Sequence, residues 1–228
     1  MKFRRKSSES APETAQTTPD EADGGESPSG GALAGGPFDA DELPDDGVER
    51  VDLGALLIAT DEKRSLRMQV DERTGEVQAV LLAAPEGALE LRAFAAPRNG
   101  DLWSELRPQI AADMARRGGT ATEREGRWGT ELVCQLTVKR GEGTVTQPSR
   151  FIGINGSRWM LRATLVGRPA IDFELGESWE DAIARVAVRR GSGPRPVGDP
   201  LPVKLPEGAK PVSGAAAPAP QPGAPRQA

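Results

Sequence analysis

The stretch RFIGINGSRWMLRATLVG, residues 150–167, decides the fold, because it joins two alternating runs through the dipeptide Asn155-Gly156. Asn-Gly between two such runs is typical of a β-hairpin with a two-residue type I′ turn. This turn predicts a register in which Ile152 lies opposite Trp159. One face of the hairpin is then apolar and lies against the core; it carries Ile152, Trp159, Leu161, Ala163 and Leu165.

The opposite face of this hairpin combines apolar and basic side chains. The same register places Phe151 opposite Met160, with Arg158 and Arg162 flanking the pair. We expect both arginines to lie at the surface, so that replacing them with alanine leaves folding intact. Arginines beside aromatic side chains can bind a base or a phosphate by stacking and charge-assisted hydrogen bonds. The candidate binding residues are therefore Arg150, Phe151, Arg158, Met160 and Arg162.

Upstream of the hairpin, the sequence predicts further strands. Residues 65–71 alternate between apolar and polar side chains, and a mainly apolar stretch, residues 77–82, follows Gly75, which is typical of a hairpin with glycine in the left-handed position. Residues 89–94 predict a third strand, and residues 120–127 and 130–140 predict a second strand pair. Consecutive strands with short connections favour an antiparallel sheet.

Two helices are predicted to pack on this sheet. Asp101 can cap the first, which ends at Gly118-Gly119, and Pro108 predicts a kink or a delayed start. Ser178 begins a capping-box pattern for the second helix. The apolar stripes are Trp103, Leu106, Ile110 and Met114 in the first helix, and Trp179, Ala182, Ile183 and Val186 in the second. The predicted fold class is α+β, an antiparallel sheet of six to eight strands with two packed helices.

Both ends of the chain have the composition of disordered segments. Residues 1–50 contain twelve acidic and five basic residues, a net charge of −7, and the C-terminal end is rich in Ala, Pro and Gly. We expect a disordered tail (1–36), an acidic linker that docks or stays free (37–50), the α+β domain (51–190), an extended Pro-rich segment (191–208) and a second disordered tail (209–228).

The Pro-rich segment offers a cover for the mixed face of the hairpin. Between its prolines, residues 195–208 carry Val197, Leu201, Val203 and Leu205. An extended segment of this kind can lie across the sheet, wait for a partner or stay disordered, and the sequence leaves these alternatives open.

Composition excludes several kinds of chemistry. The chain has no histidine and one cysteine, so it lacks the usual general base of Ser and Cys triads and the usual zinc ligands. Cys134 alternates with apolar residues, which predicts a buried strand thiol. The glycine-rich stretches match neither a phosphate-binding loop nor a dinucleotide fingerprint. We therefore predict no catalytic, cofactor-binding or metal-binding residues.

Location and charge narrow the choice of partners. No apolar run approaches the 18 residues or more of a membrane span, and polar residues follow the basic start where a signal peptide needs an apolar stretch. We expect a cytoplasmic protein without membrane contact. The negative charge of the acidic linker, residues 37–50, repels nucleic acid, which disfavours a nucleic-acid partner.

Six separated blocks carry a family resemblance: FDADELPDDGVERVDLGALLI, ELRAFAAPRNGDLW, GGTATEREGRWGTEL, RFIGINGSRWMLR, VAVRRG and DPLPVKLP. Their order resembles a family of uncharacterised actinobacterial proteins known as a domain of unknown function, over roughly residues 37–206. The family's genes often lie near that of a dUTP-hydrolysing enzyme, which implies a loose link to nucleotide or DNA maintenance. The resemblance supplies no catalytic residues or cofactor, and it implies that the acidic and Pro-rich blocks belong to the domain.

The sequence favours a non-catalytic binding or adaptor protein with an unknown protein partner. The alternative is an enzyme or ligand-binding protein that acts on a nucleotide or another phosphorylated small molecule, with Arg150, Arg158 and Arg162 as anion clamps. A site lined by these arginines would favour the alternative, and a flat face crossed by the Pro-rich segment would favour the adaptor.

Overall fold

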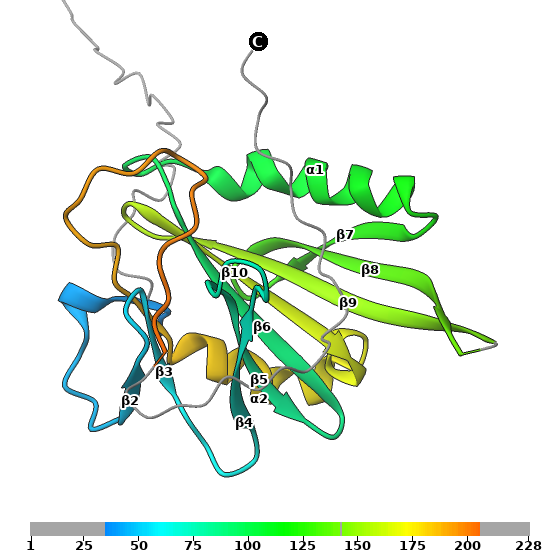
Figure 1. The fold of residues 1–228 in the computed structure, drawn as a ribbon, viewed down its shortest axis with the longest axis horizontal. Coiled ribbons are helices and arrows are strands. Elements are labelled where there is room, and N and C mark those ends of the chain that lie inside the picture. Colours follow the sequence, from blue (N-terminus) through cyan, green and yellow to red (C-terminus); the bar gives the residue numbers. More distant parts are fainter. Residues whose placement is uncertain (1–34, 142, 206–228) are drawn as a thin grey trace, which may run out of the picture.

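The computed structural model describes residues 35–141 and 143–205. Nearly all of the predicted N-terminal tail and the whole of the predicted C-terminal tail lie outside these residues. The described chain forms two sheets and two α-helices (Figure 1).

Seven strands form one large antiparallel sheet, in the order β4-β5-β6-β10-β9-β8-β7. They are β4 (Ser65–Val70), β5 (Val77–Ala84), β6 (Gly87–Ala95), β7 (Thr120–Gly126), β8 (Gly129–Arg140), β9 (Gly143–Asn155) and β10 (Trp159–Gly167). Gly75 joins β4 to β5 with a φ of 72°, the left-handed conformation predicted for it. The predicted α+β class, with six to eight antiparallel strands and two helices, is confirmed.

A second, smaller sheet has four short strands in the order β1-β11-β3-β2. They are β1 (Phe38–Asp39), β2 (Arg50–Asp52), β3 (Leu56–Ala59) and β11 (Ala187–Val188). β1 pairs in parallel with β11, and the Asp39 carboxylate accepts hydrogen bonds from Trp159 Nε1 and Ser157 Oγ. These contacts attach the acidic N-terminal stretch to the rest of the fold.

Helix α1 (Leu102–Arg116) begins where the sequence predicts. The side chain of Asp101 caps it by accepting a hydrogen bond from Ser104 N. The predicted delay at Pro108 is wrong, because the helix is continuous from Leu102 through that proline. Gly118 follows the helix with a φ of 75°, as its role in ending the helix requires.

Helix α2 (Phe173–Ala184) begins five residues before the predicted Ser178. Asp172 supplies the cap by accepting a hydrogen bond from Leu175 N, so Ser178 lies within the helix. A Cβ at Gly176 would lie 3.1 Å from Pro169 O and 3.4 Å from Arg150 Nη2. Glycine is therefore favoured inside this helix by the close approach of the helix to its neighbours. Short 3₁₀ turns, η1 (Ala40–Glu42) and η2 (Arg168–Ala170), complete the elements.

The β9–β10 hairpin has a different turn from the predicted one. Asn155 pairs with Met160 and Ile152 pairs with Ala163 in place of Trp159, so the connection is longer than two residues and the register is shifted by four. The Asn155 side chain is engaged elsewhere: its Nδ2 donates to Asp101 Oδ1 at 2.7 Å. Because side chains alternate with a period of two, a shift of four residues leaves the predicted faces of the two strands unchanged.

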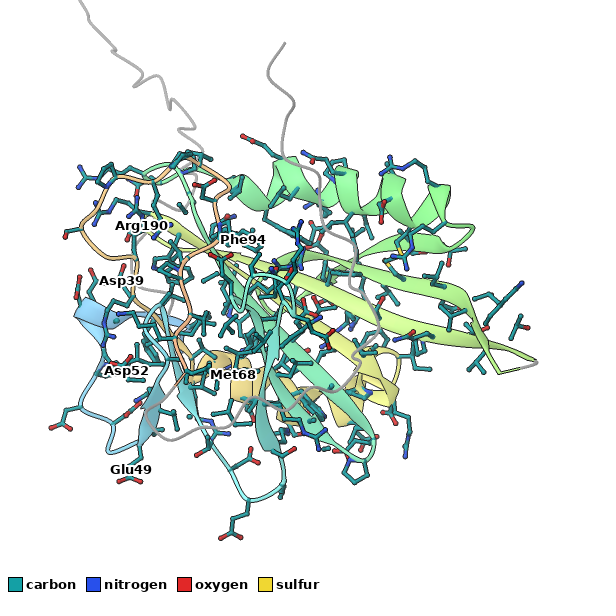
Figure 2. The ribbon with its side chains drawn as sticks, in the orientation of Figure 1. Asp39, Glu49, Asp52, Met68, Phe94 and Arg190 are labelled. Carbon is teal, nitrogen blue, oxygen red and sulfur yellow. The ribbon has the colours of Figure 1, made fainter. Side chains whose placement is uncertain are left out.

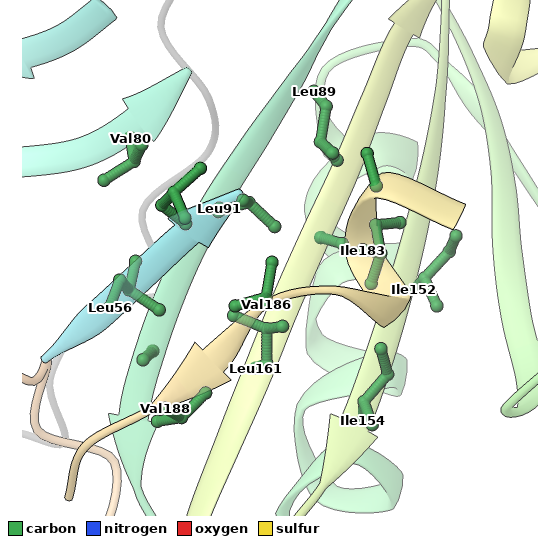
Figure 3. Packing of buried hydrophobic residues seen from close by; sticks show 14 of the residues in the cluster. Leu56, Val80, Leu89, Leu91, Ile152, Ile154, Leu161, Ile183, Val186 and Val188 are labelled. Atoms are coloured by element: carbon green, nitrogen blue, oxygen red, sulfur yellow. The ribbon is translucent and has the colours of Figure 1, made fainter. Parts of the chain in front are cut away.

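The large sheet has a helix on each side (Figure 1). We call the side that carries α2 and the small sheet the inner face, and the side that carries α1 the outer face. The inner face holds the larger core, to which β3, β5, β6, β9, β10, β11 and α2 all contribute (Figure 3). The outer core joins α1 to the sheet through Trp103, Ile110, Met114, Phe151 and Met160.

Candidate functional site

The structure separates the five predicted binding residues into three places. Arg150 points to the inner face, where it is 0% exposed. Phe151, Met160 and Arg162 share the outer face and are buried. Arg158 is exposed in the β9–β10 connection. The predicted surface position of Arg158 is confirmed, and that of Arg162 is wrong because Arg162 is 1% exposed.

Helix α1 covers the pair Phe151 and Met160, which pack in one cluster with Trp103 and Met114. A Cβ at Gly153 would lie 2.0 Å from the Trp103 ring, so the indole rests directly on the backbone of β9. The residues that cover this pair therefore come from α1, whereas the sequence offered the Pro-rich segment as a cover in one of three open alternatives. The sequence did not reveal this because the packing of a helix on a strand depends on tertiary contacts.

A first charged cluster lies on the inner face, and we call it the inner arginine cluster. It contains Arg124, Glu131, Arg150, Phe173 and Glu180. Arg150 Nη2 donates to Glu180 Oε1 at 2.5 Å, and Arg124 Nη1 donates to Glu131 Oε1 at 3.2 Å. The guanidiniums of Arg124 and Arg150 lie 3.5 and 5.3 Å from the centroid of the Phe173 ring. These contacts link the start of α2 to strands β7, β8 and β9.

Charges in the inner arginine cluster balance, with two arginines and two glutamates. Burial raises the pKa of Glu131, and the neighbouring guanidiniums of Arg150 and Arg124 oppose this effect. Arg150 Nη1 lies 3.7 Å from Glu131 Oε1, which makes an ion pair without a hydrogen bond, and neither Arg150 Nε nor Arg150 Nη1 has a hydrogen-bond partner among the described residues. Balanced charge beneath a helix indicates a structural role in holding α2 to the sheet.

A second charged cluster lies on the outer face, and we call it the outer arginine cluster. It contains Glu90, Arg92, Phe94, Arg162 and Thr164. Arg162 pairs with Arg92 across β10 and β6, and Thr164 pairs with Glu90 in the same way. Arg162 Nη2 donates to Glu90 Oε1 at 3.3 Å. Both guanidiniums lie over the Phe94 ring, at 5.7 Å for Arg92 and 5.6 Å for Arg162.

Charge in the outer arginine cluster does not balance, because two arginines share the single carboxylate of Glu90. Burial lowers the pKa of Arg92 and of Arg162, and the charge of Glu90 opposes this in both. Within the described residues, Arg92 Nε, Arg162 Nε and Thr164 Oγ1 are buried without a hydrogen-bond partner. Two spare guanidinium donors and a hydroxyl thus lie together beside an excess positive charge.

Aromatic side chains bound the outer arginine cluster on two sides. Arg162 pairs on β9 with Gly153, on which the Trp103 ring rests. Phe94, labelled in Figure 2, lies two residues after Arg92 on β6 and therefore on the same face of the sheet. Arg92 is only half-buried, unlike Arg162, and it therefore provides the approach to the cluster. An anionic group with a flat or apolar neighbour fits this combination of donors and rings.

Arg92 is the residue that sequence reasoning missed. In the strand predicted for residues 89–94, alternation puts Glu90, Arg92 and Phe94 on the face opposite Leu89 and Leu91. Nothing in the sequence shows that this strand, β6, pairs with β10, and this pairing brings Arg92 beside Arg162. The sequence does show that β6 has a polar face opposite its core face. It does not show which strand lies beside that polar face.

Other chemistry in the described residues is limited. Cys134 is buried, and desolvation raises its pKa to about 11, which confirms the predicted buried thiol. Over residues 35–141 and 143–205, no group of three or more Cys, Asp or Glu residues is placed to hold a metal ion. In the same part of the chain, neither helix is long and apolar enough to cross a membrane.

Comparison with known proteins adds a family and one partial structural likeness. A family model described as "Protein of unknown function (DUF3710)" matches residues 36–211. No curated protein matches the sequence. A 1.50 Å crystal structure from Bacteroides thetaiotaomicron VPI-5482 is 12% identical, with a TM-score of 0.36, over 62% of this chain and 48% of that one. The chain spans about half the length of that protein.

Proposed function

This chain belongs to the family described as protein of unknown function (DUF3710), and from that premise we propose that it is a non-catalytic binding protein. Its outer arginine cluster receives a negatively charged group of a protein partner. An aspartate or glutamate side chain of the partner is the group that fits two neighbouring guanidiniums. We propose in addition that the protein is cytoplasmic and that its source is an actinobacterium.

The observation that carries the proposal is the excess charge around Arg162. A buried donor without a hydrogen-bond partner costs about 1–3 kcal/mol, so spare donors in a buried site call for an acceptor. The spare atoms are Arg92 Nε, Arg162 Nε and Thr164 Oγ1, and they lie on adjacent strands of one face. A carboxylate offers about four lone-pair sites and a negative charge, so one bound at the half-buried Arg92 would balance the charge of the second arginine.

The chemical nature of the cluster supports binding in preference to catalysis. Arginine stays protonated in proteins, so it holds an anion but does not take up or release a proton at neutral pH. The single carboxylate, Glu90, is already paired with Arg162. The cluster therefore offers charge and hydrogen bonds to a bound group.

A second candidate function rests on the same two guanidiniums. They also suit a phosphorylated small molecule, because neighbouring arginines bind phosphate by charge-assisted hydrogen bonds. A nucleotide is the first such ligand to test, and a gene neighbour that hydrolyses dUTP would agree with it. In this reading, Arg92 and Arg162 hold the phosphate group.

The test is a thermal-shift and calorimetric screen of the full chain against three probes: a Glu-rich peptide, inorganic phosphate and a panel of nucleotides. A ligand that binds the native state raises Tm. We expect a shift with the acidic peptide that Arg92→Gln abolishes, because Arg92 is half-buried and its loss spares the fold.

Arg158→Gln is the matched control, since Arg158 is an exposed arginine outside the cluster, and its variant should respond as the wild type does. A shift with nucleotides alone would replace the protein partner with the second candidate. No shift with any probe, or an equal loss in both variants, would overturn the proposal for this cluster.

A further inference from the structure

Strands β5 and β6 pair along only part of their length. Their pairing runs from Val80 opposite Leu91 to Ala84 opposite Gly87, although β5 begins at Val77 and β6 continues to Ala95. The two strands therefore separate at one end of the sheet and leave a fork. Residues 198–204, which we call the docked segment, occupy that fork (Figure 1, orange).

The docked segment is bound to β6 as an added strand. Leu201 N donates to Ala93 O at 2.8 Å, and Ala95 N donates to Asp199 O at 2.8 Å. Gly198 N also donates to Ala95 O at 2.8 Å. These bonds satisfy backbone groups of β6 beyond the point where β5 leaves it.

A second set of bonds attaches the docked segment to the chain around the small sheet. Lys204 N donates to Leu53 O at 2.8 Å, and Ala55 N donates to Pro202 O at 3.2 Å. Val203 forms bridges to both Gly54 and Val77. The docked segment thus joins the two sheets, and its binding site is formed by backbone groups from each of them.

The sequence of the docked segment suits an extended peptide site. Its prolines, Pro200 and Pro202, flank Leu201, whose amide donates to β6, so neither proline takes the place of that donor. Leu201 is 4% exposed and belongs to the inner core, and Val203 packs against the same core. Proline also restricts the free peptide to extended conformations, which reduces the entropy lost on binding.

The connection to the docked segment is exposed throughout. Residues 191–197 are all exposed, and Val197 is 55% exposed although it is apolar. This connection therefore contributes little burial of its own, and the segment is held mainly by its backbone bonds and by Leu201 and Val203. A segment held in this way can leave its site without disrupting the strands on either side.

We propose that the fork is a docking site for an extended peptide of a protein partner, in which apolar residues alternate with prolines. The docked segment fills this site in the free chain as an internal competitor. This is strand addition, in which main-chain bonds give affinity and apolar side chains give specificity. The site is separate from the outer arginine cluster and does not depend on the function proposed for it.

The partner peptide must compete with a tethered segment. A short flexible tether gives its segment an effective concentration in the millimolar range, so a free peptide binds weakly until the tethered copy is displaced. Weakening the docked segment should therefore expose the fork. Leu201→Asp does so in the full chain, because it places a charge in the apolar position of the segment and leaves the fork unchanged.

The probe is a fluorescent synthetic peptide with the sequence of residues 197–205, and the readout is fluorescence anisotropy. We expect it to bind the Leu201→Asp protein about tenfold or more tightly than the wild type. The same peptide carrying Leu201→Asp should not bind either protein. Val197→Asp in the full chain is the matched control, because Val197 lies outside the fork, and it should leave the affinity at the wild-type value.

A second variant covers the case in which Leu201→Asp fails to fold. A protease site inserted between residues 191 and 196 allows the tether to be cut while the segment keeps its native sequence. After cutting, the labelled peptide should replace the cut segment. Absence of both binding and replacement would overturn the proposal, and so would a wild-type dimer that Leu201→Asp converts to a monomer, because that assigns the fork to a second copy.

Discussion

The two faces of the large sheet each contain a buried arginine beside glutamate, yet the two arginines differ in charge balance. On the inner face, Arg124 and Arg150 meet two glutamates beneath α2. On the outer face, the cluster has one carboxylate for two arginines: Glu90 forms an ion pair with Arg162, while Arg92 Nη2 donates to Gln78 Oε1 at 3.4 Å. Burial alone therefore does not distinguish a structural arginine from one proposed to bind a partner. Each cluster also has one arginine that reaches solvent, Arg124 on the inner face and Arg92 on the outer face, so the distinction comes from the number of carboxylates that each cluster contains.

The largest expected effect is that of Arg150→Met. This change leaves Glu180 without its 2.5 Å partner and removes one of two cations beside buried Glu131. Breaking a buried pair by removing one member costs about 3–5 kcal/mol. Urea unfolding followed by tryptophan fluorescence measures it. A loss below about 1 kcal/mol would mean that the inner arginine cluster does not hold α2, and the comparison between the faces would fail.

Arg162→Met, the matched change on the outer face, is expected to cost less, about 1–2 kcal/mol. Glu90 keeps Arg92 as a neighbour, and the substitution removes a guanidinium whose Nε has no partner among the described residues. The same unfolding experiment compares the two variants directly. Equal losses for Arg150→Met and Arg162→Met would show that both arginines are structural and would weaken the case for an outer binding site.

The smallest effect is a change in pH dependence caused by Glu131→Gln. Burial raises the pKa of Glu131 in the folded state above its ordinary value of 4.5. The resulting penalty on stability is absent below pH 4.5, grows as pH rises past that value, and is complete above the raised pKa. Wild-type stability should therefore lose more between pH 4 and pH 7 than that of the variant. Parallel stability profiles for the two proteins would contradict the raised pKa.

Local patterns predicted the faces of the sheet well. Alternation assigned Ile152, Leu161 and Leu165 to the core face, and the structure confirms all three. Asp101 and Gly118 marked the boundaries of α1 because caps depend on nearby residues. Such features depend on chain neighbours, which are visible in one sequence.

Features that depend on distant contacts were not predicted. Asn155 is bonded to Asp101, so the expected tight turn gives way to a longer connection. The pairing of β6 with β10, which forms the outer arginine cluster, joins strands that are separated by α1 and three other strands. The small sheet was missed because strands of two to four residues carry no detectable alternation.

The parallel pairing of Phe38 with Ala187 has a consequence for synthesis of the chain. A ribosome releases Phe38 long before Ala187, so β1 has no partner during most of translation. β3 also lacks one of its pairing partners until late in synthesis, because it pairs with Ala187 and Val188 of β11. A nascent chain that stops before these residues leaves the buried side chains of Leu56 and Ile58 without part of their cover, and such exposed apolar surface is what chaperones and proteases recognise.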